Sequence, residues 1–138
     1  MERKPITTST IRQMKVEGRP STMITAYDYA MARNVDEAGI DMILVGDSVG
    51  NVMLGYSSTI PVTMDAMIHH TQAVVRGTKY ALVVGDMPFM SYQASEAEGL
   101  MNAGRFLKEG GILDELENAG IQEGDTVRMY GFEFDYYK

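Results

Sequence analysis

The chain has 138 residues, of which 45% are hydrophobic and 22% charged, as is typical of one soluble globular domain. Its net charge of −7 argues against nucleic acid as a partner, because binding to the phosphate backbone depends on clustered Lys and Arg. The absence of cysteine excludes disulfides, thiolate metal sites and cysteine nucleophiles.

The hydropathy pattern contains no membrane or secretory segment. No apolar run approaches the roughly 18 residues that a membrane-spanning helix needs. The basic pair Arg3 and Lys4 has no apolar stretch behind it, unlike a signal peptide. We therefore expect a soluble, cytoplasmic protein that binds neither membranes nor nucleic acid.

The first part of the chain predicts one short helix followed by three strand–helix units. The short helix begins at Thr7, continues through Val16 and ends at Gly18. The strands are apolar runs that we expect to be buried, and they cover 23–27, 41–45 and 81–84. The helices cover 28–38, 63–77 and 95–109. Thr63 and Ser95 are predicted caps, the latter in a capping box with Glu98.

Strands that are continuously apolar and alternate with helices of this length imply an α/β fold with a parallel sheet and right-handed crossovers. In the helix over 63–77, one stripe is expected to face the sheet. Its members are Met64, Met67, Ile68, Thr71, Val74 and Val75.

The composition changes near Gly110 and Gly111. Residues 1–111 carry 12 acidic and 10 basic side chains, a net charge of −2, whereas residues 112–138 carry 7 acidic and 2 basic ones, a net charge of −5. We divide the chain at this point into βα units over 1–111 and an acidic helix plus β-hairpin over 112–138. The second part is expected to pack on the first in one compact domain.

The predicted hairpin lies at the C-terminal end. A two-residue turn at Tyr130 and Gly131 would place Met129 opposite Phe132, and Val127 opposite Phe134, on one apolar face. The alternative is a single bent strand with a bulge at Gly131.

Carboxylates follow the predicted strands. Asp47 and Asp86 each come directly after a glycine at the end of a strand, and Asp28 ends the first strand in a looser copy of the pattern. The carboxyl edge of a parallel sheet is where ligands bind. Neighbouring strands lie about 4.8 Å apart, so two such aspartates can hold one Mg²⁺. Asp47 and Asp86 are therefore metal candidates; alternatively, each only caps the next loop or helix.

Other polar residues give weaker signals. His69 and His70 are adjacent on a helix and point about 100° apart, so we expect them on the surface or the rim of a site. The methionines are interpreted as core filler. Neither a Walker loop nor a Gly-x-Gly-x-x-Gly sequence is present, so nucleotide binding has no motif behind it.

A series of linked motifs runs almost continuously from Thr7 to Gly111. In chain order they are Thr25-Ala26-Tyr27-Asp28, Val45-Gly46-Asp47-Ser48, Leu54-Gly55-Tyr56, Thr59-Ile60-Pro61-Val62-Thr63, His69-His70-Thr71 and Gly85-Asp86-Met87-Pro88-Phe89-Met90-Ser91-Tyr92. Together they resemble ketopantoate hydroxymethyltransferase. The resemblance implies a (β/α)₈ barrel, and a full barrel takes about 250 residues. We therefore expect residues 1–111 to form a partial (β/α)₈-barrel fragment.

The same resemblance implies a function. The family transfers a hydroxymethyl group from methylenetetrahydrofolate to 3-methyl-2-oxobutanoate, a step of pantothenate biosynthesis, with Mg²⁺ binding the keto acid. Asp47 and Asp86 match its metal ligands, and Ser48 and Asp86 match its substrate contacts. A metal ion that polarises the keto group makes the adjacent carbon easier to deprotonate.

Residues after Gly111 depart from this pattern. The family's fourth strand with a Lys and a Glu, and its later glutamate that acts as general base, have no counterpart here. Instead, 116–128 and 132–136 resemble the C-terminal end of Obg-type GTPases, without any GTP-binding machinery. We therefore expect a chimeric or engineered chain that has no catalytic residues, binds Mg²⁺ weakly and is not an active enzyme.

Two alternatives stay open. The first is an active hydroxymethyltransferase that uses Mg²⁺ and methylenetetrahydrofolate, with self-association supplying the missing half of the barrel. The second is an interaction module that binds through its exposed surface. Open strand edges favour a homo-oligomer, and a small keto acid is the expected ligand.

Overall fold

A computed structural model describes residues 3–111, 126–129 and 132–135. Over 3–111 the chain forms a three-stranded parallel sheet and five helices. The strands are β1 (Met23–Thr25), β2 (Met42–Val45) and β3 (Leu82–Gly85). The helices are α1 (Thr8–Val16), α2 (Tyr29–Glu37), α3 (Val49–Val52), α4 (Met64–Gly77) and α5 (Glu96–Glu109). No helix in these described ranges has the length and apolar character needed to cross a membrane.

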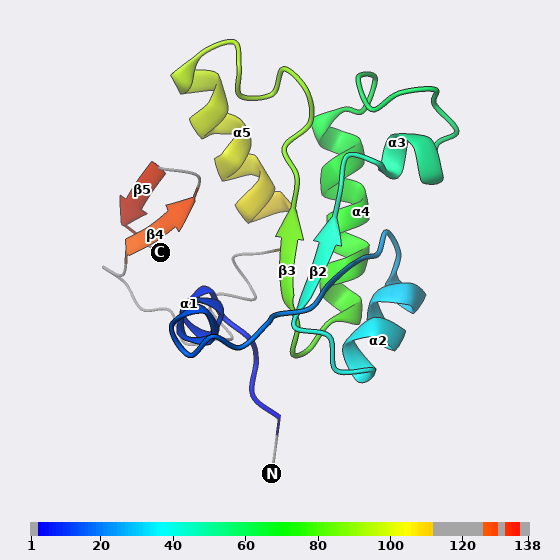
Figure 1. The fold of residues 1–138 in the computed structure, drawn as a ribbon. Coiled ribbons are helices and arrows are strands. Elements are labelled where there is room, and N and C mark those ends of the chain that lie inside the picture. The colour runs from blue at the N-terminus through cyan, green and yellow to red at the C-terminus, as the bar shows by residue number, and fades with distance from the viewer. Residues whose placement is uncertain (1–2, 112–125, 130–131, 136–138) are drawn as a thin grey trace.

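The sheet has the order β1-β2-β3, so strands that follow one another in the chain are neighbours in space. Ile24 lies beside Ile43, and Ile43 lies beside Val83. Helix α4 packs against β2 and β3 and contacts both α2 and α5 (Figure 1). Successive right-handed βα units with this strand order are the arrangement found in a (β/α)₈ barrel. The predicted α/β class is confirmed.

The core lies between the sheet and α4. Ile43 and Val83 point to it from the strands, Met67 and Val74 from α4, and Phe106 from α5. The predicted stripe of α4 is buried as expected, except that Val75 at its edge is only partly buried. Close packing of these apolar side chains holds the helices to the sheet.

The expectation that the first strand is buried is wrong. Met23 and Ile24 of β1 keep 47% and 43% of their surface exposed. Among the described residues β1 pairs with β2 alone, and α2 packs against β2. An apolar run predicts a strand but does not tell whether that strand has a neighbour on both sides, and β1 lies at the edge of this sheet.

Side-chain caps begin the longer helices where the sequence predicts them. The side chains of Thr63 and Ser95 accept hydrogen bonds from backbone N–H groups in the first turns of α4 and α5. Thr7 caps α1 through a reciprocal pair of hydrogen bonds with Thr10. Helix α3 falls in a stretch for which the sequence pattern predicts no helix. It has only four residues, and its Val49 is fully buried, so tertiary packing rather than local propensity determines it.

Gly85 permits α5 to approach the sheet closely. A Cβ at this position would lie 2.6 Å from Cζ of Phe106, closer than real Cβ contacts come. Phe106 is almost completely buried, with 2% of its surface exposed. The absence of a side chain at Gly85 therefore makes room for an aromatic ring of the core.

The opposite edge of the sheet, where the strands begin, is held by the buried carboxylate of Asp36, which is 3% exposed. Its two oxygens accept backbone N–H bonds from Lys79 at 3.1 Å, Tyr80 at 3.1 Å and Ala81 at 2.7 Å. These three residues lead into β3. Asp36 therefore fixes the start of β3 against the end of α2, with its charge compensated by three donors.

Arg3 adds a second contact at the same place. Its guanidinium donates to the backbone carbonyl of Asp36 and, at 3.0 Å, to that of Ile40, and it lies 4.9 Å above the ring of Tyr80. The N-terminal segment is thereby tied to the turn between α2 and β2 and to the residues before β3.

The last two strands confirm the predicted hairpin register. β4 (Thr126–Met129) and β5 (Phe132–Asp135) are antiparallel, with Met129 opposite Phe132 and Val127 opposite Phe134. The alternative of one bent strand is therefore wrong. The turn at 130–131 and the helix expected over 113–119 lie outside the described residues.

Replacement of Asp36 by alanine is expected to lower the free energy of unfolding by about 3 kcal/mol, because three buried N–H groups lose their acceptor. Urea denaturation followed by circular dichroism measures the change. Glu37→Ala is the matched control, since this neighbouring carboxylate is exposed and pairs with Arg33 on the same helix, so its effect should be far smaller. Equal effects of the two variants would contradict the role assigned to Asp36.

Candidate functional site

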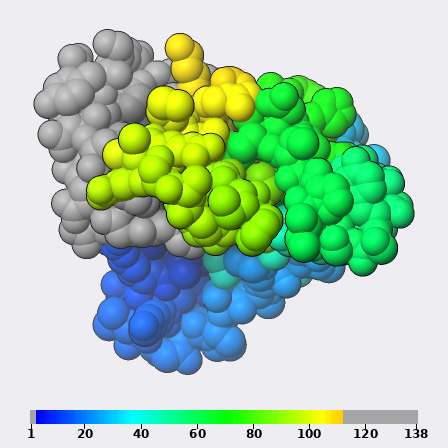
Figure 2. All heavy atoms as spheres, turned by 90° about the horizontal axis from the view of Figure 1, so that it is seen from above, coloured from blue at the N-terminus to red at the C-terminus, as the bar shows by residue number. Residues whose placement is uncertain are grey.

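Four polar residues follow the strands at the carboxyl edge of the sheet. Tyr27 follows β1, Asp47 and Ser48 follow β2, and Asp86 follows β3. All four are half-buried. Figure 2 looks down on this end of the molecule, where the segments that follow β2 and β3 make up much of the surface. Parallel strands bring these residues to one edge although they are far apart in sequence.

The structure brings the two aspartates together. The backbone N–H of Asp47 donates to Oδ2 of Asp86 at 3.3 Å. A Cβ on Gly46 would lie 2.9 Å from Oγ of Ser48 and 3.4 Å from the same Asp86 oxygen. The Ser48 hydroxyl and the Asp86 carboxylate therefore crowd around one glycine, and the predicted residues Asp47, Ser48 and Asp86 form one cluster.

Tyr27 belongs to this cluster, and the sequence analysis did not single it out. Its hydroxyl lies 2.6 Å from Oγ of Ser48. Nδ1 of His70 lies 2.7 Å from the backbone carbonyl of Tyr27. His69 is exposed, and its ring is perpendicular to that of His70, with the ring centroids 5.3 Å apart. The two histidines therefore point in different directions, as their adjacent positions on a helix predict. The position of Tyr27 at the carboxyl end of a predicted strand is the sequence feature that could have indicated a place in this cluster.

The oxygen atoms of the cluster are of the kind that a small, oxygen-preferring cation takes as ligands. Asp47 and Asp86 are the two carboxylates that could bind such an ion, and none of the ion pairs found in the described part of the chain involves either of them. A third His, Asp or Glu does not complete the set within those ranges. Mg²⁺ is commonly held by one or two carboxylates and keeps several waters, so two such ligands suit it.

Asp28 does not join the cluster. It is exposed, and its carboxylate accepts the N–H of Met31 at 2.8 Å, which caps α2. The capping alternative therefore holds for this aspartate. At the start of α3 the capping position belongs to Ser48, whose side chain makes no capping bond.

Comparison with known proteins gives this geometry a family. The family model described as ketopantoate hydroxymethyltransferase matches residues 5–122. The chain belongs to this family. Curated 3-methyl-2-oxobutanoate hydroxymethyltransferases from Syntrophus aciditrophicus, Carboxydothermus hydrogenoformans and Moorella thermoacetica are 62%, 60% and 58% identical to it over 91%, 83% and 92% of the chain. The aligned parts cover 46%, 42% and 47% of those relatives, so the chain spans about half their length.

Membership in the family identifies the three βα units as part of a (β/α)₈ barrel. The family match continues past Gly111, where the motifs were expected to end, as far as residue 122. The resemblance of 112–138 to Obg-type GTPases, and the chimera inferred from it, stay predictions. The comparisons give no support to the inference that the chain is inactive.

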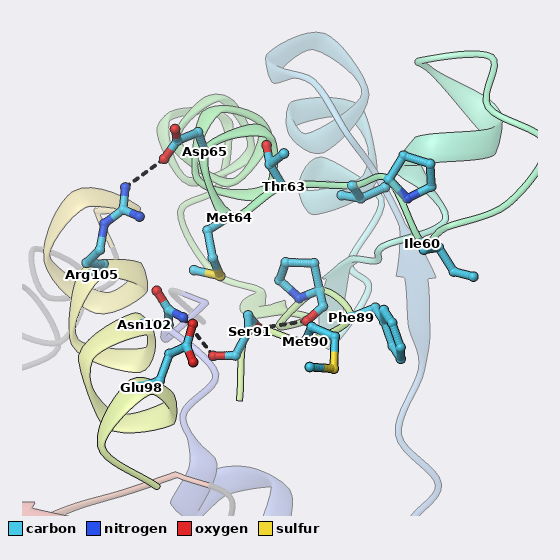
Figure 3. A pocket seen from close by; sticks show the side chains of 13 residues that line it. Ile60, Thr63, Met64, Asp65, Phe89, Met90, Ser91, Glu98, Asn102 and Arg105 are labelled. Atoms are coloured by element: carbon cyan, nitrogen blue, oxygen red, sulfur yellow. Dashed lines mark hydrogen bonds and ion pairs between the residues drawn. The ribbon is translucent and has the colours of Figure 1, made fainter. Parts of the chain in front are cut away.

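In this family member a groove adjoins the segment that follows Asp86. It lies between the start of α4, residues 88–91 and the side of α5 that faces them (Figure 3). Asn102 of α5 donates to the carbonyl of Ser91 at 2.7 Å, and Ser91 donates to the carbonyl of Pro88 at 2.7 Å. Met90 between them has φ of 64°, a conformation rare for a side chain with a Cβ. These bonds hold the loop after Asp86 in one shape.

Arg105 borders the groove and connects two helices. It donates to Asp65 of α4 at 2.7 Å and, at 3.0 and 3.1 Å, to both oxygens of Glu109 in α5. Its hydrogen bonds lower the pKa of Glu109, and those to Glu109 and Asp65 raise the pKa of Arg105. All three side chains reach solvent, so the network orients α5 more than it stabilises the fold.

Arg105→Met is expected to raise the pKa of Glu109 toward that of a free glutamate, about 4.3. Because the folded-state pKa of Glu109 is depressed, its contribution to stability is present above the unfolded-state pKa and is lost as the pH falls through the folded value. Carboxyl chemical shifts in an NMR titration measure the change. Arg33→Met, which removes a similar pair on α2, is the control and should leave Glu109 unaffected. An unchanged Glu109 pKa in Arg105→Met would contradict the pairing.

Proposed function

We propose that this chain binds a divalent cation and 3-methyl-2-oxobutanoate at the carboxyl edge of its sheet. The activity it serves is hydroxymethyl transfer from methylenetetrahydrofolate in pantothenate biosynthesis. One observation carries the proposal: the backbone N–H of Asp47 donates to the Asp86 carboxylate across neighbouring strands, and the Ser48 hydroxyl lies against Gly46 beside them. The name shared by the curated relatives supports the choice of keto acid.

Each residue of the cluster has a distinct task in this proposal. Asp47 and Asp86 hold the cation through carboxylate oxygens, and Mg²⁺ is the ion that such ligands suit. Ser48 donates its hydroxyl proton to the carboxylate of the keto acid. When bound, the cation withdraws electron density from the keto oxygen and makes the neighbouring C–H more acidic. We assign no general base to the described residues.

The charges of the cluster imply an order of binding. Two adjacent carboxylates repel an anionic keto acid, because like charges a few ångströms apart in a half-buried site are weakly screened. A bound divalent cation cancels the two negative charges and gives the keto acid a positive centre to bind. The keto acid is therefore expected to bind only after the metal.

Isothermal titration calorimetry tests this function on the full chain. Mg²⁺ is expected to bind the unmodified protein, and Asp47→Asn or Asp86→Asn should weaken it by more than about tenfold, the effect of losing one charged ligand. The keto acid should give heat only when Mg²⁺ is present and none with a chelator.

Asp65→Asn is the matched control, because Asp65 is an exposed aspartate that pairs with Arg105 away from the cluster. It should bind Mg²⁺ as the unmodified chain does. The proposal fails if the keto acid binds equally well with a chelator, or if Asp47→Asn and Asp86→Asn bind Mg²⁺ as well as Asp65→Asn does.

A further inference from the structure

The hydroxyl of Tyr27 makes a short contact that the proposed function leaves unexplained. It lies 2.6 Å from Oγ of Ser48, at the end of the neighbouring strand. We propose that Tyr27 is a positioning residue, whose hydroxyl donates to Ser48 and thereby directs the Ser48 proton toward the carboxylate of the bound keto acid. This inference rests on the role proposed above for Ser48.

The direction of the hydrogen bond follows from the acidity of the two groups. A phenol is far more acidic than an aliphatic alcohol, so the Tyr27 hydroxyl is the better donor of the pair. Serine has one proton and two lone pairs. Once Oγ of Ser48 accepts from Tyr27, its own proton is left for another acceptor, and the chain of two hydrogen bonds strengthens that donation.

The Ser48 hydroxyl does not cap α3, although Ser48 directly precedes this helix. A serine that directly precedes a helix normally accepts a hydrogen bond from an N–H of the first turn, as Ser95 does before α5. Ser48 also directly precedes its helix, α3, but its backbone is helical (φ −56°, ψ −10°) and not extended like that of Ser95 (φ −160°, ψ 155°), so its hydroxyl makes no such bond. Its side chain is held by Tyr27 across the strand ends instead, next to the carboxylate of Asp86.

Tyr27 is itself held firmly enough to orient another group. The N–H of Ala26 continues the pairing of β1 with β2 through the carbonyl of Leu44 at 3.1 Å. His70 of α4 contacts the carbonyl of Tyr27 at 2.7 Å, and the next residue, Asp28, caps α2. The backbone on both sides of Tyr27 is therefore fixed, and its half-buried ring extends from a rigid base.

This arrangement predicts an effect on one ligand and not on the other. The carboxylates that hold the metal are Asp47 and Asp86, and Tyr27 touches neither in the bonds found here. Loss of the Tyr27 hydroxyl should therefore spare Mg²⁺ binding and weaken binding of a carboxylate ligand. A purely structural role of Tyr27 would weaken both alike.

The test compares Tyr27→Phe, Ser48→Ala and the double variant by calorimetry. Affinity for Mg²⁺ should change less than about twofold, whereas affinity for 3-methyl-2-oxobutanoate at saturating Mg²⁺ should fall about fivefold in each single variant, the loss expected for one hydrogen bond. The double variant should lose no more than Ser48→Ala, because Tyr27 acts on the keto acid only through the Ser48 hydroxyl. Tyr29→Phe, an exposed tyrosine two residues away, is the control.

A second ligand separates carboxylate recognition from general damage. The methyl ester of the keto acid has no anionic carboxylate, so its affinity should respond to Tyr27→Phe less than that of the acid. Unaltered acid affinity in Tyr27→Phe, or additive losses in the double variant, overturns the positioning role while leaving the proposed function intact. Failure of the unmodified chain to bind the acid with Mg²⁺ overturns both.

Discussion

The buried carboxylate of Asp36 is the contact on which the rest of the sheet depends. It gathers three backbone N–H groups from the residues that lead into β3, and Arg3 binds the carbonyl of the same aspartate. The start of β3 is thereby set against the end of α2. In a parallel sheet the position at which a strand starts also decides where it ends, so this contact places Asp86 level with Gly46, beside Asp47, at the far edge.

The sequence predicts those elements whose causes are local. Caps at Thr63 and Ser95 and the register of the terminal hairpin depend on residues a few positions apart, and all appear as expected. The exposure of β1, the helix α3 and the contacts of Asp36 depend on what lies beside them in space. The local sequence gives Asp36 no distinguishing signal, because the backbone N–H groups that its carboxylate accepts lie more than forty positions away.

The site divides in the same way. Asp47 and Asp86 are predictable because strand ends meet at one edge, which follows from the fold class alone. Ser48 came from the family resemblance, since its position gives no chemical signal by itself. Neither the fold class nor the resemblance assigned a role to Tyr27. Whether its hydroxyl reaches the Ser48 hydroxyl on the neighbouring strand depends on the Tyr27 rotamer and on α4, where His70 contacts the Tyr27 backbone carbonyl.

The Gly-Asp dipeptide that ends β2 and β3 looks like one motif used twice, yet its two glycines exclude a side chain for unrelated reasons. Gly46 leaves space for polar atoms of the site itself, whereas Gly85 leaves space for the ring of Phe106 on the side of the core. A smaller residue at position 106 can compensate for a methyl group at position 85. Nothing comparable can compensate at position 46, where the atoms that would have to move are the Ser48 hydroxyl and the Asp86 carboxylate. The two positions will therefore tolerate change differently as such sequences diverge.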